Sequence, residues 1–200
     1  MKFFIALLKF FIHPLLSIPF IFKTQQKMNN YSSVRNEFLD YLDVKDKKIL
    51  EIGCSTGNAS KVIVDFKNND YIGIDTHAGY IELAKKNYPI GNFKKMDGRS
   101  QDFEDNFFDL ILINSMLHHV NDKDGVLIFK EAERVLKVNG KILIAEPMFS
   151  NNDRLSTFLL MLDRGDFIRS FDGYKKLFLN LKIERQRFFR FTRHNFASFV

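Results

Sequence analysis

The sequence of 200 residues has almost no cysteine, no internal repeat, no low-complexity linker and no acidic residue before Glu37. Its single cysteine, Cys54, excludes an intramolecular disulfide framework and fits a reducing compartment. No cleavage site of the Ala-x-Ala type follows the apolar N-terminal stretch, which argues against a secretory signal. The residues that are present, 46% hydrophobic and 27% charged, are sufficient to bury the core of one domain of ordinary size.

Acidic residues are missing from both ends of the chain, so its charge is unevenly distributed. The net charge of +6 combines +5 before Glu37 with +4 after Glu184, which leaves −3 for residues 37–184. The basic residues at the two ends are Lys2, Lys9, Lys23, Lys27, Arg35, Arg185, Arg187, Arg190 and Arg193. A groove that binds a polyanion is expected to run through the body of a protein, and this body is mildly acidic. Nucleic acid is therefore a disfavoured partner.

Residues 1–36 predict an apolar and basic helical segment ahead of the main domain. Its most hydrophobic part, Phe3–Phe22, approaches the length of a membrane span but is interrupted by Lys9, His13, Pro14 and Pro19. A wide apolar face with a thin basic stripe suits a helix that lies on an anionic membrane surface through residues 1–22. Two alternatives stay open: the helix docks on its own domain or on a partner subunit, or it spans the membrane. We expect a cytoplasmic protein, which contact of residues 1–22 with a membrane would place on its cytoplasmic face.

Strand-like and helix-like patterns alternate along residues 48–145. Short apolar runs predict strands at 48–53, 70–75, 92–96, 108–113 and 141–145, and helical patterns lie between them at 58–66, 79–87 and 124–137. Alternation at this spacing predicts a parallel sheet with helices on both sides. Beyond Pro147 we expect helices over 153–180 and two more strands, at 182–192 and from Phe196 onward. Because the last strand stops at the terminus, we expect it to leave the sheet edge weakly closed or completed by a partner.

The sharpest local signal is the run Glu51-Ile52-Gly53-Cys54-Ser55-Thr56-Gly57-Asn58, between the first strand and the helix that follows. Small residues here let the backbone approach a ligand closely, and a helix N-terminus favours negative charge. The spacing does not match the dinucleotide fingerprint G-x-G-x-x-G but follows an acid-x-Gly-x-small-x-Gly pattern. Such a cradle, with an acid behind it, suits a ligand that has both an ammonium and a carboxylate group.

Two further acids follow the next two strands in order. Asp75 ends the second strand about 20 residues past the glycine turn, where a carboxylate accepts hydrogen bonds from both hydroxyls of a ribose. Asp97-Gly98 follows the third strand, where a carboxylate and a backbone N–H read an adenine edge. A plain structural explanation stays open for each, because glycines also serve turns and aspartates also cap helices.

Four sequence blocks occur in a specific order. They are Ile49–Asn58, then Tyr71–Asp75 with Ile81–Lys86, then Phe108–Ile111 with Leu117–Val120, and lastly Arg134–Lys141. In these blocks the chain resembles class I S-adenosylmethionine-dependent methyltransferases, most closely the small-molecule, type 11-like branch. The resemblance covers residues 45–147 and implies an α/β, Rossmann-like, doubly wound fold: a mostly parallel, seven-stranded sheet with an antiparallel strand near one edge. It also implies a single methyltransferase domain over 37–200, with the cofactor half at 45–147 and an acceptor-side cap and last strands at 148–200.

The resemblance implies that S-adenosylmethionine is the cofactor, and it assigns residues to each part of it. The methionine part would lie against the strand–helix loop and the Asn114 backbone, that is against Glu51, Gly53, Cys54, Ser55, Gly57 and Asn114. The ribose and adenine would lie against Asp75, Thr76, Asp97 and Gly98. Cys54 itself is interpreted as a small packing residue rather than a nucleophile.

Two positions depart from the pattern of this family. Ser55 replaces the usual middle glycine, which the loop tolerates if the φ angle of Ser55 is negative. Val138-Asn139-Gly140 replaces the usual Pro-Gly-Gly turn, and we expect Asn139 to tolerate a left-handed φ there.

His118 and His119 follow the fourth strand, at the edge where ligands bind in open parallel sheets. Their pKa range suits a general base near neutral pH, so both are candidate catalytic residues. The alternative is that one histidine caps the loop and the other packs, since methyl transfer to a good nucleophile needs no base. No metal site is expected. The run Asn114-Ser115-Met116-Leu117 lacks the Asn/Asp-Pro-Pro-aromatic motif that resembles methyltransferases acting on amino groups of adenine or glutamine, which argues against those substrates.

The segment 153–180 contains a group of polar residues, namely Arg164, Asp166, Arg169, Asp172 and Tyr174. In similar proteins this insertion covers the acceptor pocket, although a solvated helix face explains the same pattern. The sequence thus predicts a methyltransferase for a small-molecule, lipid or saccharide acceptor. The alternatives are an RNA methyltransferase that uses the basic termini, and a non-catalytic cofactor-binding or scaffold protein with the same fold. The sequence does not indicate an oligomeric state.

Overall fold

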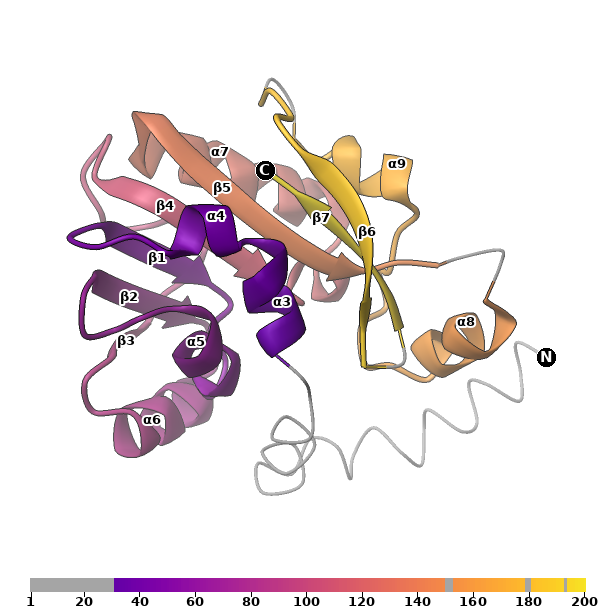
Figure 1. Ribbon diagram of the computed structural model, residues 1–200, viewed down its shortest axis with the longest axis horizontal. Helices are drawn as coiled ribbons and strands as arrows, with labels where there is room; N and C mark the ends of the chain where they lie inside the picture. The colour runs from indigo at the N-terminus through magenta and orange to yellow at the C-terminus, as the bar shows by residue number, and fades with distance from the viewer. Residues whose placement is uncertain (1–30, 150–152, 179–180, 193) are drawn as a thin grey trace.

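A seven-stranded sheet forms the centre of the computed structural model, which describes residues 31–149, 153–178, 181–192 and 194–200 (Figure 1). The strand order is β3-β2-β1-β4-β5-β7-β6. The strands are β1 (Lys48–Ile52), β2 (Asp70–Asp75), β3 (Asn92–Lys95), β4 (Phe108–Asn114), β5 (Leu136–Pro147), β6 (Gln186–Phe191) and β7 (His194–Phe199). The pairs among β1 to β5 are parallel, whereas β7 runs antiparallel to both β5 and β6. The predicted Rossmann-like, mostly parallel sheet is thereby confirmed.

Helices cover both faces of this sheet (Figure 1). One face is covered by α3 (Ser32–Glu37), α4 (Leu39–Leu42), α5 (Asn58–Ile63) and α6 (Ala78–Asn87). The other face is covered by α7 (Asp122–Val135) and α9 (Phe171–Lys175). The helix α8 (Arg154–Met161) lies against β7, and a 3₁₀ turn, η1 (Leu117–His119), follows β4.

The central strands divide their side chains between two apolar cores. In β4, Ile111 and Ile113 pack with the residues of α7, whereas Leu110 and Leu112 pack with α3, α5 and α6 on the opposite face. A strand covered on both faces needs apolar residues at successive positions, because alternate side chains point to opposite sides. This explains the continuous apolar run that marks β4 in the sequence.

Two predictions for the C-terminal half are wrong. The last strand, β7, does not leave an open edge, because it lies inside the sheet between β5 and β6. The expected turn at Val138-Asn139-Gly140 lies within β5, where the register of pairing with β4 shifts between Phe108 and Leu110. Asn139 is not among the described residues with a positive φ. At this shift some residues of β5 have no partner in β4 and form an irregularity of the strand. The chain therefore passes this point without a left-handed turn.

The start of the packed domain lies earlier than residue 37. Helix α3 falls within the range assigned to the N-terminal segment, yet Val34 is fully buried and the guanidinium of Arg35 donates a hydrogen bond of 2.6 Å to the Ile63 carbonyl. Residues 1–22, for which membrane contact is predicted, lie outside the described residues. Within the described ranges, no helix has the length and apolar character needed to cross a membrane.

Candidate active site

One cleft of about 650 Å³ opens beyond the carboxyl ends of β1, β2 and β4. It contains nine of the ten residues predicted to bind the cofactor, namely Glu51, Gly53, Cys54, Ser55, Asp75, Thr76, Asp97, Gly98 and Asn114, together with both candidate catalytic histidines. Gly57 does not line the cleft. A Cβ atom at Gly57 would lie 2.9 Å from Tyr88 Cδ2 and 3.0 Å from Phe93 Cζ, so this glycine serves the packing at the start of α5.

The loop after β1 contains three residues in the left-handed region. The φ angles are +81° at Gly53, +51° at Ser55 and +75° at Gly57. The condition under which the sequence analysis expects the loop to tolerate serine, a negative φ at Ser55, is therefore not met. The reason is visible in the contacts of this residue, since the Ser55 N–H donates a hydrogen bond of 3.0 Å to Asp75 Oδ2. A bond to an ionised acceptor is about twice as strong as a neutral one, and it offsets the strain of a left-handed serine.

Gly53 lets the loop approach the turn that follows β4. A Cβ atom at this position would lie 2.3 Å from Met116 Cγ, which no side chain tolerates. Beneath the loop, the buried carboxylate of Glu51 accepts a hydrogen bond of 2.6 Å from the Tyr71 hydroxyl, and burial raises the pKa of Glu51. Burial also raises the pKa of the Cys54 thiol well above its usual range, and such a thiol is a poor nucleophile.

Two acids line the far end of the cleft. Asp75 accepts a second backbone hydrogen bond, from the His77 N–H to Oδ1 at 2.8 Å. Asp97 is bound by Arg99, whose Nη2 lies 2.6 Å from Asp97 Oδ2 and whose Nη1 lies 3.0 Å from Asp124 Oδ1. The hydrogen bonds from Arg99 lower the pKa of Asp97. A ligand that binds Asp97 therefore meets a carboxylate already shared with a guanidinium.

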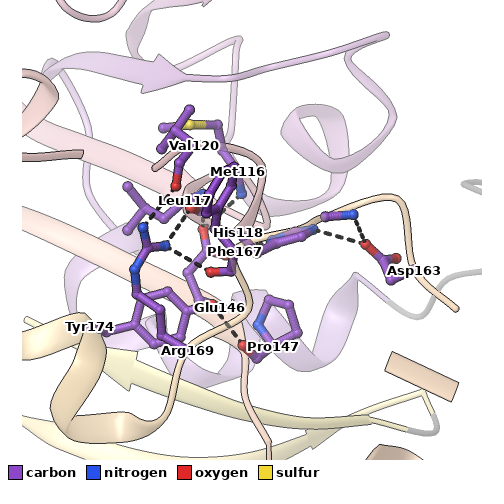
Figure 2. Close-up of polar contacts among 11 residues, drawn as sticks. Met116, Leu117, His118, Val120, Glu146, Pro147, Asp163, Phe167, Arg169 and Tyr174 are labelled. Atoms are coloured by element: carbon purple, nitrogen blue, oxygen red, sulfur yellow. Dashed lines mark hydrogen bonds and ion pairs between the residues drawn. The ribbon is translucent and has the colours of Figure 1, made fainter. Parts of the chain in front are cut away.

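The turn after β4 is held by a carboxylate that the sequence analysis did not identify (Figure 2). Glu146, at the end of β5, is fully buried. Its Oε1 accepts hydrogen bonds of 2.7 Å from the backbone N–H groups of both Met116 and Leu117, and its Oε2 lies 2.8 Å from His118 Nδ1. Because a carboxylate only accepts hydrogen bonds, Nδ1 of His118 carries the proton and Nε2 presents a lone pair.

Nε2 of His118 points toward a second unpredicted acid, Asp163 (Figure 2). The distance from Nε2 to Asp163 Oδ1 is 3.5 Å, and Oδ1 accepts a hydrogen bond of 2.7 Å from the Gly165 N–H. Burial disfavours a charged imidazole at His118, but its hydrogen bond to Glu146 and the charges of Glu146 and Asp163 outweigh this, so the pKa of His118 is raised. The His119 ring lies 4.1 Å from that of His118. Desolvation by the cleft and the neighbouring His118 lower the pKa of His119, although its side chain is exposed to the cleft.

Arg169 fixes the same turn from its carbonyl side (Figure 2). Its guanidinium donates hydrogen bonds of 2.8 Å to the carbonyls of Leu117 and Val120, and Nη2 lies 2.7 Å from Asp122 Oδ1. The Phe167 N–H donates to the His118 carbonyl at 3.0 Å. The segment that contains Phe167 and Arg169 is thus joined by hydrogen bonds to the turn that contains His118.

The polar group predicted over 164–174 does not act as one cluster. Arg164 lines the cleft, with its Nη1 3.5 Å from the Tyr80 hydroxyl. Arg169 fixes the β4 turn, and the buried hydroxyl of Tyr174 donates to the Pro147 carbonyl at 2.8 Å. Asp172 is exposed and forms an ion pair with Lys175. Apolar residues complete the wall of the cleft on this side, namely Leu160, Phe191 and Phe196.

Comparisons with known proteins identify a methyltransferase domain in this chain. A family model described as a methyltransferase domain matches residues 50–144. Phosphoethanolamine N-methyltransferase 3 of Arabidopsis thaliana is 31% identical over 116 residues, which are 55% of this chain and 23% of the relative. Demethylmenaquinone methyltransferase of Thermotoga maritima is 28% identical over 116 residues, which are 58% of this chain and 50% of the relative. The chain thus spans half the length, or less, of these two relatives.

Solved structures show the same fold. A protein of Pyrococcus horikoshii matches with a TM-score of 0.70 at 18% identity, covering 90% of each chain. An S-adenosylmethionine-dependent methyltransferase of Methanosarcina mazei matches with a TM-score of 0.65 at 20% identity, covering 81% of this chain and 95% of the other. At this identity the likeness concerns the fold alone.

Proposed function

The chain belongs to the class I S-adenosylmethionine-dependent methyltransferase superfamily, and on this premise we propose that it transfers a methyl group to a small-molecule, lipid or saccharide acceptor. The observation that supports this most is the division of one cleft into two parts. The first part, called the cofactor half below, consists of the loop after β1 with Asp75 and Asp97. The second, called the acceptor half, consists of His118, His119, Asp163 and the apolar wall.

The cofactor half fits S-adenosylmethionine by its chemistry. Each Asp75 oxygen has two lone pairs and accepts one backbone N–H, which leaves capacity for the two ribose hydroxyls. Asp97 and Gly98 line the same cleft and would contact the adenine edge, and residues of the left-handed loop line the cleft as well. When bound, S-adenosylmethionine supplies a methyl group on a positively charged sulfur, the leaving group of an in-line displacement.

In the acceptor half, His118 is the residue suited to take a proton from an acceptor. Its Nδ1 is committed to Glu146, its Nε2 faces the cleft beside Asp163, and its pKa is raised. The pKa of His119 is lowered, so this histidine is suited to contact the acceptor but is a weaker base than His118. Positioning of the acceptor supplies most of the rate enhancement, and His118 adds to it when the acceptor must lose a proton.

The walls of the acceptor half indicate an acceptor with two chemical parts. A polar head would contact His119, Asp163 and Arg164, while an apolar part would lie against Leu160, Phe191 and Phe196. The two relatives named above act, by their names, on phosphoethanolamine and on demethylmenaquinone, one polar and one largely apolar small molecule. A small-molecule acceptor with both characters is therefore our proposal.

The contacts of the C-terminal arginines weigh against an RNA substrate. Arg185 forms an ion pair of 3.2 Å with Asp40, and Arg190 pairs with Asp153. Both guanidinium groups are thus used within the fold. Salt-sensitive RNA binding that disappears after removal of residues 185–200 would nevertheless revive the RNA alternative.

The test is transfer of labelled methyl from S-adenosylmethionine into fractionated cell extract, followed by identification of the product by mass spectrometry. We expect a labelled small molecule with the wild-type chain and none with Asp75→Ala. Tight cofactor binding without label in any fraction would instead support the non-catalytic alternative.

A further inference from the structure

The acceptor half contains three side chains whose donor atoms converge on one point. The imidazoles of His118 and His119 and the carboxylate of Asp163 each offer one ligand atom, and these atoms all lie within 4.8 Å of one another. The sequence alone predicts no metal site, because Asp163 lies far along the chain from the two histidines. From this juxtaposition we propose that His118, His119 and Asp163 bind a divalent metal ion of the Zn²⁺ type.

The distance between His118 Nε2 and Asp163 Oδ1 fits one bridging ion better than it fits a hydrogen bond. His118 Nε2 and Asp163 Oδ1 are 3.5 Å apart, beyond the usual N–H···O range of about 2.7–3.2 Å. Two ligands with bonds of about 2.0–2.2 Å to one tetrahedral zinc ion lie about 3.4 Å apart. The observed separation therefore leaves room for the ion between the two atoms.

Glu146 supplies the outer contact that such a site requires. Metal-bound histidines almost always donate their other ring N–H to a carboxylate or carbonyl, which fixes the tautomer and the ring orientation. The 2.8 Å contact between His118 Nδ1 and Glu146 Oε2 does this, and Glu146 is in turn held by two backbone N–H groups. Asp163 is likewise fixed by the Gly165 N–H. Both ligands are thus oriented before an ion arrives.

The charges around the cluster favour a cation. The carboxylates of Glu146 and Asp163 lie 2.8 Å and 3.5 Å from the two ring nitrogens of His118, and Arg164 lines the same cleft. With His118 neutral, two carboxylates and one guanidinium leave this group with one net negative charge, which favours a cation.

The protein would supply two nitrogens and one oxygen, and the remaining coordination positions of the ion would open to the cleft. Such a ligand set is typical of a metal ion that binds a further group. In this cleft that group would be an oxygen or nitrogen of the acceptor. With the ion bound, His118 Nε2 would be a ligand, and the ion rather than this nitrogen would promote loss of the acceptor proton.

Metal binding is measurable without cofactor or acceptor, so the inference does not depend on the proposed activity. A tag-free full-length chain, freed of metal with a chelator, is titrated with Zn²⁺ alone by calorimetry. We expect one ion per chain. His119→Gln and Asp163→Asn should each weaken binding at least about tenfold, and Glu146→Gln about 10–100-fold because it reverses the His118 tautomer. His77→Gln is the matched control, because this exposed histidine lines the same cleft outside the cluster, and its zinc affinity should equal that of the wild type.

A second measurement uses only the wild-type chain and so does not depend on the folding of any variant. Anomalous diffraction at the zinc edge from zinc-soaked crystals should place a peak within bonding distance of His118 Nε2, His119 and Asp163. The proposal is overturned by a peak elsewhere or by no peak, by the absence of saturable zinc binding, or by variants that bind zinc as the wild type does. Loss of binding in His77→Gln would equally overturn it.

Discussion

The cofactor half and the acceptor half of the cleft are assembled in different ways. In the cofactor half, each residue follows the carboxyl end of its own strand, so the order of β1, β2 and β3 in the sheet brings the loop, Asp75 and Asp97 together. In the acceptor half, His118, Glu146 and Asp163 come from a turn, a strand end and a distant loop. Residues of the first half are placed by the sheet alone. In the second half the pairing of β4 with β5 places His118 and Glu146, and Asp163 joins them only through contacts of a distant loop. The two halves should therefore fail separately when mutated.

The largest effect on the cofactor half is expected from Asp75→Ala. The change removes the acceptor of the Ser55 and His77 N–H groups as well as the proposed ribose contact. Each bond to a charged acceptor contributes about 1.5–3 kcal/mol, so S-adenosylmethionine affinity should fall by at least about tenfold in calorimetry. Asp70→Ala, at the exposed start of the same strand, is the control and should bind as the wild type does. Equal losses in both variants would contradict the role of Asp75.

Glu146→Gln should affect only the acceptor half. The amide keeps an acceptor for the Met116 and Leu117 N–H groups, but its NH₂ faces His118 Nδ1 and forces the proton onto Nε2. For an acceptor that must lose a proton, turnover should fall about 10²–10⁴-fold while cofactor affinity stays the same. Glu146→Ala should instead lower the free energy of unfolding by about 2–5 kcal/mol, because it leaves buried donors without partners. Unchanged turnover in Glu146→Gln would remove His118 from the proposed mechanism.

Gly165→Ala tests how closely the Asp163 loop approaches His118. A Cβ atom there would lie 2.1 Å from His118 Cδ2 and 2.7 Å from its carbonyl oxygen, so the loop must move away. We expect a loss of about 1–3 kcal/mol in unfolding free energy and reduced turnover, with cofactor affinity retained. The control is Gly79→Ala, whose Cβ meets only the His77 side chain, at 3.1 Å, and whose added methyl suits helix α6. A Gly165→Ala variant as stable as the wild type would show that the contact is loose.

Ser55→Gly should have the smallest effect. Glycine adopts the left-handed φ of +51° without strain, but it gains more conformational freedom in the unfolded chain. The relief of strain stabilises the folded chain, and the added freedom stabilises the unfolded chain. The free energy of unfolding should therefore change by less than about 1 kcal/mol, and cofactor affinity should be maintained. A larger loss would mean that the Ser55 side chain makes a contact the loop depends on.

The contrast between the halves also explains what the sequence could predict. The order of strands and the acids at their ends follow from local patterns, so the sheet and the gathering of nine of the ten predicted cofactor-binding residues in one cleft were predictable. The φ angle of Ser55 was not, because it depends on a hydrogen bond to Asp75 from another strand. The position of β7 inside the sheet depends in the same way on pairing between distant segments.

Glu146 and Asp163 had only weak signals in the sequence. Glu146 directly follows the predicted strand 141–145, where an acid at a strand end reads as an ordinary turn residue. Its burial and its contact with His118 arise only when β4 and β5 pair. Asp163 lies next to the predicted polar group but was not included in it, since its contact with His118 requires the acceptor-side segment to fold back over the β4 turn.

The division of the cleft is tested most directly by a crystal structure of the chain with S-adenosylhomocysteine. The ribose hydroxyls should lie within hydrogen-bond distance of Asp75, the adenine edge should reach Asp97 and Gly98, and the sulfur should face the turn that contains His118. A nucleoside bound away from Asp75, or a sulfur turned away from the acceptor half, would contradict the division of the cleft into these two halves.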